Sequence, residues 1–194
     1  IYASSSSSDL QKISMSNNGD RLAIVECYVG VFVYEKFDDL EQSQWQQIGQ
    51  EEYDFATEGV CTTSLNASGD QWAVGRARTN EERGRIDVFS SDSLGSWSAV
   101  GNGIEGRYPG ARYQLPDLSD LGNRFVGSAR AESSSNTGYT AVYELNQDTL
   151  IWEQIGEDLQ GEGHYARISG NGDFIVVTTN SYDRTSFSPV TKVF

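Results

Sequence analysis

The sequence of 194 residues predicts an all-β fold built from four copies of one unit of about 50 residues. A glycine that closes a polar turn recurs at Gly19, Gly69, Gly122 and Gly172, at steps of 50, 53 and 50 residues. A tryptophan that stands four residues before a glycine recurs at Trp45, Trp97 and Trp152. Landmarks that return in constant order at this period are typical of a β-propeller, in which each repeat forms one four-stranded blade.

A β-sandwich with coincidental turns is the alternative. A sandwich gives no reason for a tryptophan to return at a fixed place in every unit, so the repeat favours the propeller. The composition agrees, because aromatic residues make up 11% of the chain and 20 glycines accompany only 3 prolines. Such a chain is rich in turns and strand-forming residues.

The first unit starts near Leu10. Ile13 and Met15 alternate with serines, which predicts a half-buried strand. A hairpin turn follows at 17–20, where Asn and Gly tolerate the positive φ of tight turns. The apolar run 22–25 predicts an inner strand that is covered on both faces. The third and fourth strands are expected over 29–34 and 45–49.

The second unit gives the clearest copy. Its strands are expected over 61–65, 71–75, 85–89 and 97–101, with a turn over 66–70 and a charged connection over 76–84. The third unit begins near Tyr113, and Pro116 removes a backbone donor, which predicts a bulge in its first strand. Its later strands are expected over 125–127, over 139–145 and from Trp152 onward, with a polar loop over 131–138.

The fourth unit runs from His164 through a turn at 170–173 and a strand over 174–179 to a third strand that ends at Phe194. The blades therefore cover about 10–58, 59–110, 111–162 and 163–194, and the serine-rich segment 1–9 is a linker or a closing strand. Either Ile1-Tyr2-Ala3 supplies the missing fourth strand and closes a four-bladed ring, or these are four blades of six to eight. We favour the larger ring, because the chain begins and ends inside the pattern.

The net charge of −14 argues against nucleic acid and anionic lipid as partners. The sequence contains no apolar run long enough to cross a bilayer and no signal peptide. A chain that starts at Ile1 is expected to be a mature or partial product. The acidity suits a soluble surface or a basic partner.

One set of candidate ligand-binding residues lies eight positions before each turn glycine: Gln11, Cys61, Gln114 and His164. A ring of these side chains would lie near one mouth of the central channel and would either bind a small ligand or only contact water. His164 is the only histidine, so neither a multi-histidine metal site nor a catalytic triad is expected. We expect no metal, no cofactor and no catalytic residue set.

Cys27 and Cys61 are the only cysteines. They end and begin strands on the same side of adjacent blades, so a disulfide is geometrically conceivable in an oxidising compartment. The alternative is two buried free thiols that behave as small apolar residues.

Acidic residues cluster after two of the outer strands: Glu51, Glu52, Asp54, Glu157, Asp158 and Glu162. Paired acids can hydrolyse glycosides, but loop acids in so acidic a protein are usually solvated. Aromatic residues near loops would either stack on sugars or pack between blades: Tyr53, Phe55, Tyr108, Tyr113 and Tyr165. Asn66-Ala67-Ser68 matches an N-glycosylation acceptor and is also the predicted turn.

Four short motifs recur in this order: Ser-x-x-Gly-Asp, Ala-Val-Gly, Val-Tyr/Phe and Trp-x-x-Ile-Gly. Together they resemble a β-propeller repeat of secreted and surface proteins in marine bacteria and in algae such as diatoms. That repeat is loosely similar to the integrin α-chain (FG-GAP) propeller. The resemblance covers residues 10–194 and implies a propeller, an extracytoplasmic setting and an interaction role. Calcium binding is not implied, since no Asp-x-Asp-x-Asp-Gly loop occurs here.

These observations predict a non-enzymatic interaction scaffold, an accessory subunit of a secreted, periplasmic or organelle-lumenal assembly. Other protein chains are the expected partners. A carbohydrate-binding module and a glycoside hydrolase that uses loop carboxylates are the alternatives.

Overall fold

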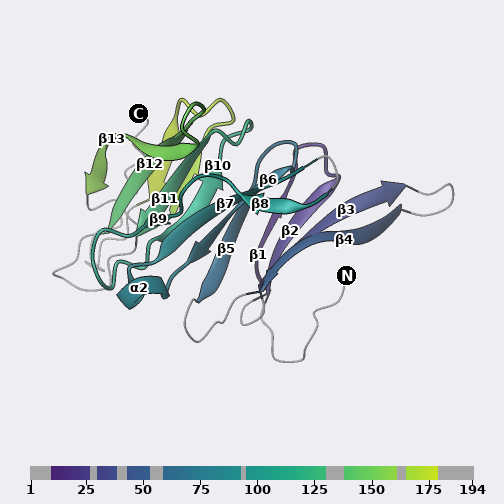
Figure 1. Ribbon diagram of the computed structural model, residues 1–194, viewed down its shortest axis with the longest axis horizontal. Helices are drawn as coiled ribbons and strands as arrows, with labels where there is room; N and C mark the ends of the chain where they lie inside the picture. Colours follow the sequence, from purple (N-terminus) through teal and green to yellow (C-terminus); the bar gives the residue numbers. More distant parts are fainter. Residues whose placement is uncertain are drawn as a thin grey trace.

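The computed structural model describes residues 10–26, 30–38, 43–52, 59–92, 95–129, 138–160 and 165–178. These residues form antiparallel sheets, and within each sheet consecutive strands pair, except that one short strand of the second sheet pairs with the strand two before it. The sheets lie side by side in chain order, with strands β1–β4 (residues 10–52) at the right of Figure 1 and strands β10–β13 (residues 114–160) toward its left. The architecture is that of β-propeller blades, as the repeat predicts.

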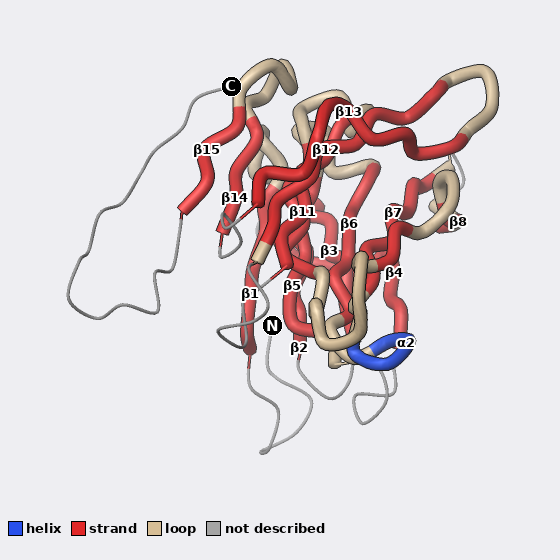
Figure 2. The backbone as a smooth tube through the Cα atoms, turned by 90° about the vertical axis from the view of Figure 1, so that its left-hand side faces the viewer, coloured by secondary structure: helices blue, strands red, loops and turns tan. Residues whose placement is uncertain are grey.

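Blade one contains four strands: β1 (Leu10–Met15), β2 (Arg21–Glu26), β3 (Gly30–Asp38) and β4 (Ser43–Glu52). Blade two contains five: β5 (Val60–Leu65), β6 (Gln71–Arg76), β7 (Arg85–Ser91), β8 (Trp97–Ala99) and β9 (Ile104–Glu105). Both β8 and β9 pair with β7, so the fourth strand predicted over 97–101 ends at Ala99 and a second short strand follows beyond it. A short helical turn, α2 (Thr79–Glu82), occupies the charged connection and lies at the lower end of the strands in Figure 2.

Blade three contains β10 (Gln114–Leu118), β11 (Arg124–Ala129), β12 (Tyr139–Asn146) and β13 (Ile151–Gln160). The pairing of β10 with β11 shifts between Gln114 and Asp117, which confirms the irregular strand predicted at Pro116. Blade four contributes β14 (Tyr165–Ile168) and β15 (Ile175–Thr178). Its predicted third strand, like segment 1–9, lies outside the described residues.

The four polar turns have the predicted backbone. The turn glycines take φ between +67° and +77°, a region that residues with a Cβ rarely enter. Each glycine N–H donates to the carbonyl of the residue three positions earlier, as in Gly19 to Ser16 and Gly172 to Ser169. The turns therefore join the first and second strands of each blade in the same way.

Hydrophobic cores lie between successive blades. One core joins blades one and two around Val33, Trp72 and Val74. A second joins blades two and three around Ile86, Phe125 and Trp152, and a third joins blades three and four around Val126 and Ile175. The second strand of each of the first three blades is almost fully buried, as the apolar run 22–25 predicts. These cores bury the faces that neighbouring blades turn toward one another.

Candidate functional site

Successive blades are joined at their turns by a repeated backbone hydrogen bond. The residue two positions before the turn glycine donates its N–H to the carbonyl of the equivalent residue in the next blade. The three bonds run from Asn17 to Ala67, from Ala67 to Asp120 and from Asp120 to Gly170, at 2.9, 3.2 and 2.8 Å. All three blade junctions thus share one geometry.

A side chain five positions before the turn glycine forms a second repeated contact. Ser14 Oγ accepts the N–H of Leu65 at 2.8 Å, and Ser64 Oγ accepts the N–H of Leu118 at 3.2 Å. Asp117 Oδ2 accepts the N–H of Ile168 at 2.9 Å. In each case the acceptor satisfies a backbone donor of the next blade, which would cost free energy if it were buried without a partner.

Arginine forms a third contact at two of the junctions. Arg21 binds Glu35 in its own blade and donates to the carbonyl of Gly69 in the next. Arg124 does the same with Glu144 and the carbonyl of Gly172. Arg21 and Arg124 therefore link neighbouring blades beside the polar turns.

The repeated tryptophan forms the fourth contact, and it reaches back to the preceding blade. Trp97 Nε1 donates to the carbonyl of Ile48 at 3.1 Å, and Trp152 Nε1 donates to the carbonyl of Val100 at 2.9 Å. A Cβ on Gly49 would collide with the Trp97 ring, and one on Gly101 would lie 2.8 Å from Cδ1 of Trp152. The glycine of the Trp-x-x-x-Gly motif has no side chain and therefore leaves room for the tryptophan ring of the next blade.

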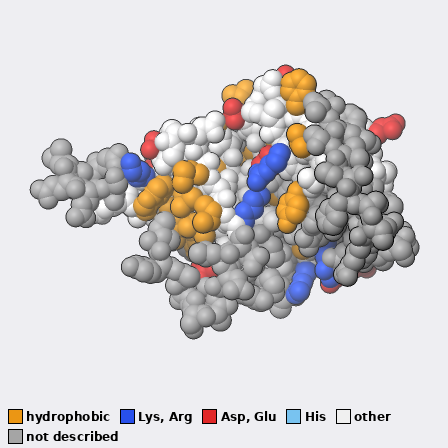
Figure 3. All heavy atoms as spheres, turned by 180° about the vertical axis from the view of Figure 1, so that it is seen from behind, with side chains coloured by type: hydrophobic (Ala, Val, Ile, Leu, Met, Phe, Trp, Pro, Cys, Tyr) orange, Lys and Arg blue, Asp and Glu red, His pale blue; other side chains and the backbone are white. Residues whose placement is uncertain are grey.

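Blade one presents an open face made of Ile13 and Met15, which we call the blade-one face. Met15 is 55% exposed, whereas Leu65 at the equivalent position of blade two is 6% exposed. The difference arises because blade one covers Leu65, while no described residue covers Met15. Seen from behind, hydrophobic side chains gather over the end of the molecule formed by blade one (Figure 3).

Blade four presents a second open face, the blade-four face, made of alternate residues of its hairpin: Tyr165, Arg167, Phe174, Val176 and Thr178. Val176 is 42% exposed, whereas Ala73 and Val126 at the equivalent positions are fully buried. The other side of the same hairpin packs on blade three through Ile168 and Val177. Among the described residues, no blade packs on either of these two faces.

Charged groups of the two end blades influence one another at the inner strands. Burial, and after it the positive charge of Arg167, lower the pKa of Lys12 to about 8, while Asp117 acts in the opposite direction. Arg167 donates to Asp117 Oδ1 at 2.6 Å. Lys12 belongs to blade one and Arg167 to blade four, so the inner strands bring the two end blades into electrostatic range.

The hydrolase alternative depends on the loop carboxylates, and the structure shows what some of them bind. Asp158 accepts two hydrogen bonds from Arg107, at 2.8 and 3.0 Å, and one from Gln154. The bond to Asp158 raises the pKa of Arg107 above its usual range. Glu157 lies beside Asp158 on β13, Glu51 and Glu52 lie on β4, and Asp54 and Glu162 fall outside the described residues. Asp158 therefore serves an ion pair and is not a free acid.

Some of the aromatic residues predicted near loops pack between blades, and one of them is exposed. Tyr113 is fully buried and stacks on Tyr139 with centroids 5.4 Å apart, and Tyr108 packs edge-on against Tyr139. These two residues belong to the packing between blades. Tyr165 is exposed, and Tyr53 and Phe55 lie outside the described residues.

The predicted channel ring falls at strand irregularities. The pairing of β1 with β2 skips Gln11, and the pairing of β5 with β6 skips Cys61, so both residues occupy β-bulges. Gln114 is buried, and its side chain lies against Gly75 of blade two. His164 and Cys27 lie outside the described residues, so the ligand ring and the Cys27–Cys61 disulfide stay predictions.

Asn66 is buried and is used within its turn. Its amide donates to Asp70, and its carbonyl accepts the N–H of Gln71. Within the described ranges, no group of three or more histidine, cysteine, aspartate and glutamate residues could hold a metal ion. No helix among those residues is long and apolar enough to cross a membrane.

Solved structures show what this chain resembles. It is similar to a candidate 6-phosphogluconolactonase from Bacteroides uniformis, at 15% identity and a TM-score of 0.61 over 96% of this chain and 53% of that one. It is also similar to Sqt1 from Saccharomyces cerevisiae, at 11% identity and a TM-score of 0.62 over 88% and 43%. A chain of the mitotic checkpoint complex matches at 15% identity and a TM-score of 0.57 over 94% and 50%.

No protein-family model matches the sequence, and no curated protein matches it. The chain spans about half the length of the solved structures that it resembles. At these identities the likeness shows the fold alone. The fold that the chain shares with these structures is the β-propeller.

Proposed function

We propose that this chain is a non-enzymatic protein-interaction scaffold that forms four consecutive blades of a larger β-propeller. The observation that supports this function most directly is the pair of open faces at the two ends of the blade array. Met15 and Val176 stand at positions that are buried wherever a neighbouring blade is present. Exposed apolar surface of this kind is best stabilised by another protein surface.

The use of charge in the described residues agrees with a scaffold. Asp117 and Arg124 bind backbone groups of the next blade. Asp158 binds the guanidinium group of Arg107. An acid that catalyses glycoside hydrolysis needs a second acid across a sugar-sized gap. Asp158 is instead paired with Arg107, which favours interaction over catalysis.

We further propose that the scaffold is an accessory subunit of an extracytoplasmic or organelle-lumenal assembly. The support for this setting is the resemblance of the repeat to repeats of secreted and surface proteins. The likeness to a chain of the mitotic checkpoint complex supports protein partners in general.

The test is the native mass of the protein purified from its source, compared with three variants. We expect an assembly larger than the 21.4 kDa of this chain, with a fixed stoichiometry. Met15→Glu and Val176→Glu should each reduce it, because they put a charge on an open face. Phe37→Glu is the matched control, since Phe37 is 45% exposed on β3 and belongs to neither face. A lone 21.4 kDa species that the three variants leave unchanged would contradict the proposal.

A further inference from the structure

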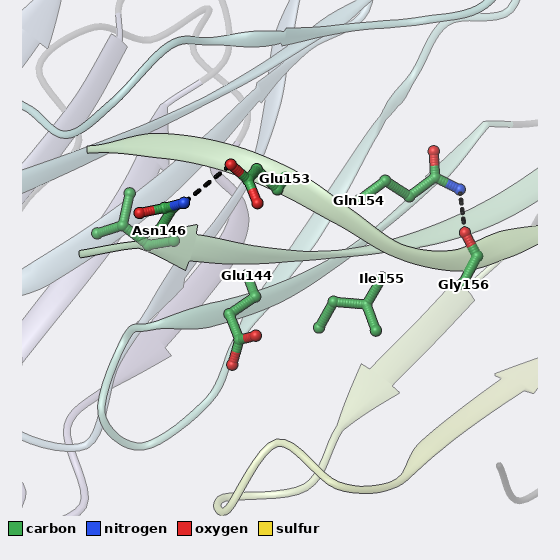
Figure 4. A pocket seen from close by; sticks show the side chains of 7 residues that line it. Glu144, Asn146, Glu153, Gln154, Ile155 and Gly156 are labelled. Atoms are coloured by element: carbon green, nitrogen blue, oxygen red, sulfur yellow. Dashed lines mark hydrogen bonds between the residues drawn. The ribbon is translucent and has the colours of Figure 1, made fainter. Parts of the chain in front are cut away.

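A hollow of about 470 Å³ lies on the outer strands of blade three (Figure 4). We call this hollow the Gly156 socket. Its lining comes from β12 and β13: Glu144, Leu145, Asn146, Glu153, Gln154, Ile155 and Gly156. In the two preceding blades the equivalent surface is where the next tryptophan seats.

Blade one shows what occupies this place when a neighbour is present. Blades one and three share the sequence motif Trp-x-Gln-Ile-Gly, which ends at Gly49 in blade one and at Gly156 in blade three. On blade one, the indole N–H of Trp97 binds the carbonyl of Ile48, and its ring lies on Gly49. The Gly49 surface of blade one therefore shows how a bound tryptophan occupies such a socket.

Blade three presents the same surface uncovered. Ile155, the counterpart of Ile48, is 40% exposed. No atom of the described residues lies within 4 Å of a Cβ built on Gly156. The space that Trp97 fills over blade one is thus open over blade three.

The chemistry of the socket suits an indole ring. Glu144 and Glu153 are directly opposite each other in the β12–β13 pair and share a face with Ile155. Arg124 holds Glu144, and Asn146 holds Glu153. The edge of an aromatic ring carries partial positive charge, so carboxylates beside an apolar floor favour a ring with an N–H donor.

We propose that the Gly156 socket binds the tryptophan of an extended segment that carries a Trp-x-x-x-Gly motif and serves as the fourth strand of blade four. Trp97 and Trp152, which carry this motif, bind the preceding blade in this way. In blades one to three the tryptophan follows the third-strand Val-Tyr or Val-Phe pair by 11, 8 and 9 residues. None of the four tryptophans in these 194 residues takes the equivalent place after the fourth such pair, Val193-Phe194. This inference rests on the proposed function, because it names the chemistry that completes blade four.

The test is a titration of the 194-residue chain with a peptide that copies residues 91–103 and carries 5-fluorotryptophan at position 97. This strand is the natural partner of the matching wording in blade one. We expect a saturable change of the ¹⁹F resonance, with a dissociation constant of about 0.1 to 1 mM for one unanchored strand. A second peptide that carries Trp97→Ala should not displace the fluorinated peptide when the two compete for the chain.

Two variants of the chain locate the binding. Gly156→Asn tolerates the φ of +69° and places a side chain in the socket, so it should weaken binding at least about tenfold. Ile155→Asp, which removes the apolar floor, should do the same. Gly110→Asn is the matched control, because Gly110 has a φ of +77° and open space around it but lies far along the chain from the socket.

Equal affinity for the wild type and Gly156→Asn would overturn the inference, as would the absence of binding at several millimolar peptide. Dimerisation that Trp45→Ala abolishes and Gly156→Asn also abolishes would show that a second copy occupies the socket, and would overturn it too. None of these results bears on whether the native protein forms a larger assembly, which the mass measurement decides separately.

Discussion

The junctions inside the blade array and its two ends use the same positions of one repeat in opposite environments. Leu65 is buried under blade one, while Met15, its counterpart, is exposed. Trp152 is seated on Gly101, while Gly156 carries no such ring among the described residues. The comparison teaches that this repeat is not a self-sufficient unit, because apolar residues such as Leu65 and Trp152 are buried against a neighbouring blade.

The largest expected contrast is between two tryptophans of the same motif. Trp152→Ala should destabilise the chain by about 3–5 kcal/mol, because it empties a buried site between blades two and three. Trp45→Ala should cost about 1 kcal/mol, because Trp45 is only half-buried and seats on no described blade. Urea unfolding followed by circular dichroism measures both values. Equal losses would mean that the two ends are not different from the junctions.

A second contrast separates two of the four residues that stand four positions before a turn glycine. Leu65→Ala should cost about 2–4 kcal/mol, and Met15→Ala should cost less than about 1 kcal/mol. The same unfolding experiment measures them. If Met15→Ala were as costly as Leu65→Ala, blade one would have a neighbour in the isolated chain.

A third experiment exchanges one junction contact for another. Asp117→Ala leaves the buried N–H of Ile168 without its acceptor and should cost about 2–3 kcal/mol. Asp117→Ser should recover part of this loss, because Ser14 and Ser64 perform the same task at the other two junctions.

Arg167→Ala is the control for the ion pair with Asp117. Its side chain is 66% exposed, so its loss should change the free energy of unfolding by less than about 1 kcal/mol. A larger effect of Arg167→Ala than of Asp117→Ala would show that the ion pair, and not the backbone contact, stabilises this junction.

The last prediction concerns the dependence of stability on pH. The folded-state pKa of Lys12, about 8, lies below its ordinary value of 10.5, so the unfolded chain holds more protons between these values. Stability should therefore rise with pH from about 8 to about 10.5, and Lys12→Met should remove that rise. The difference between the wild type and Lys12→Met, measured by urea unfolding at pH 7, 8, 9 and 10, cancels the contributions of other groups. A constant difference over this range would contradict the assignment.

The sequence pattern predicted the blades well where the turn itself carries the signal. The glycines at 19, 69, 122 and 172 all take positive φ, and the strands around them lie where the apolar runs place them. The two short outer strands of blade two were not predictable from the apolar pattern, because an irregular segment over 100–103, in which Gly101 takes a φ of +70°, separates β8 from β9.

The contacts between blades were harder to predict, because each side chain finds its partner about 50 residues away. Ser14, Ser64 and Asp117 differ in type, yet each accepts a backbone N–H of the next blade. The usable signal was a short polar side chain at a fixed distance before the turn glycine. The channel ring was placed by counting residues across β-bulges, which shift the register and so uncouple position in the repeat from position in space.

The most direct test of the open array uses the only methionine of the chain, Met15. Peroxide converts an exposed methionine to its sulfoxide, and intact-mass spectrometry follows the added oxygen. We predict rapid oxidation of Met15 in the isolated 194-residue chain and strong protection of the same residue in the protein purified from its source. Protection in the isolated chain would indicate a closed four-bladed ring. Equal oxidation in both samples would contradict the account, because no neighbour would then cover blade one in the native assembly.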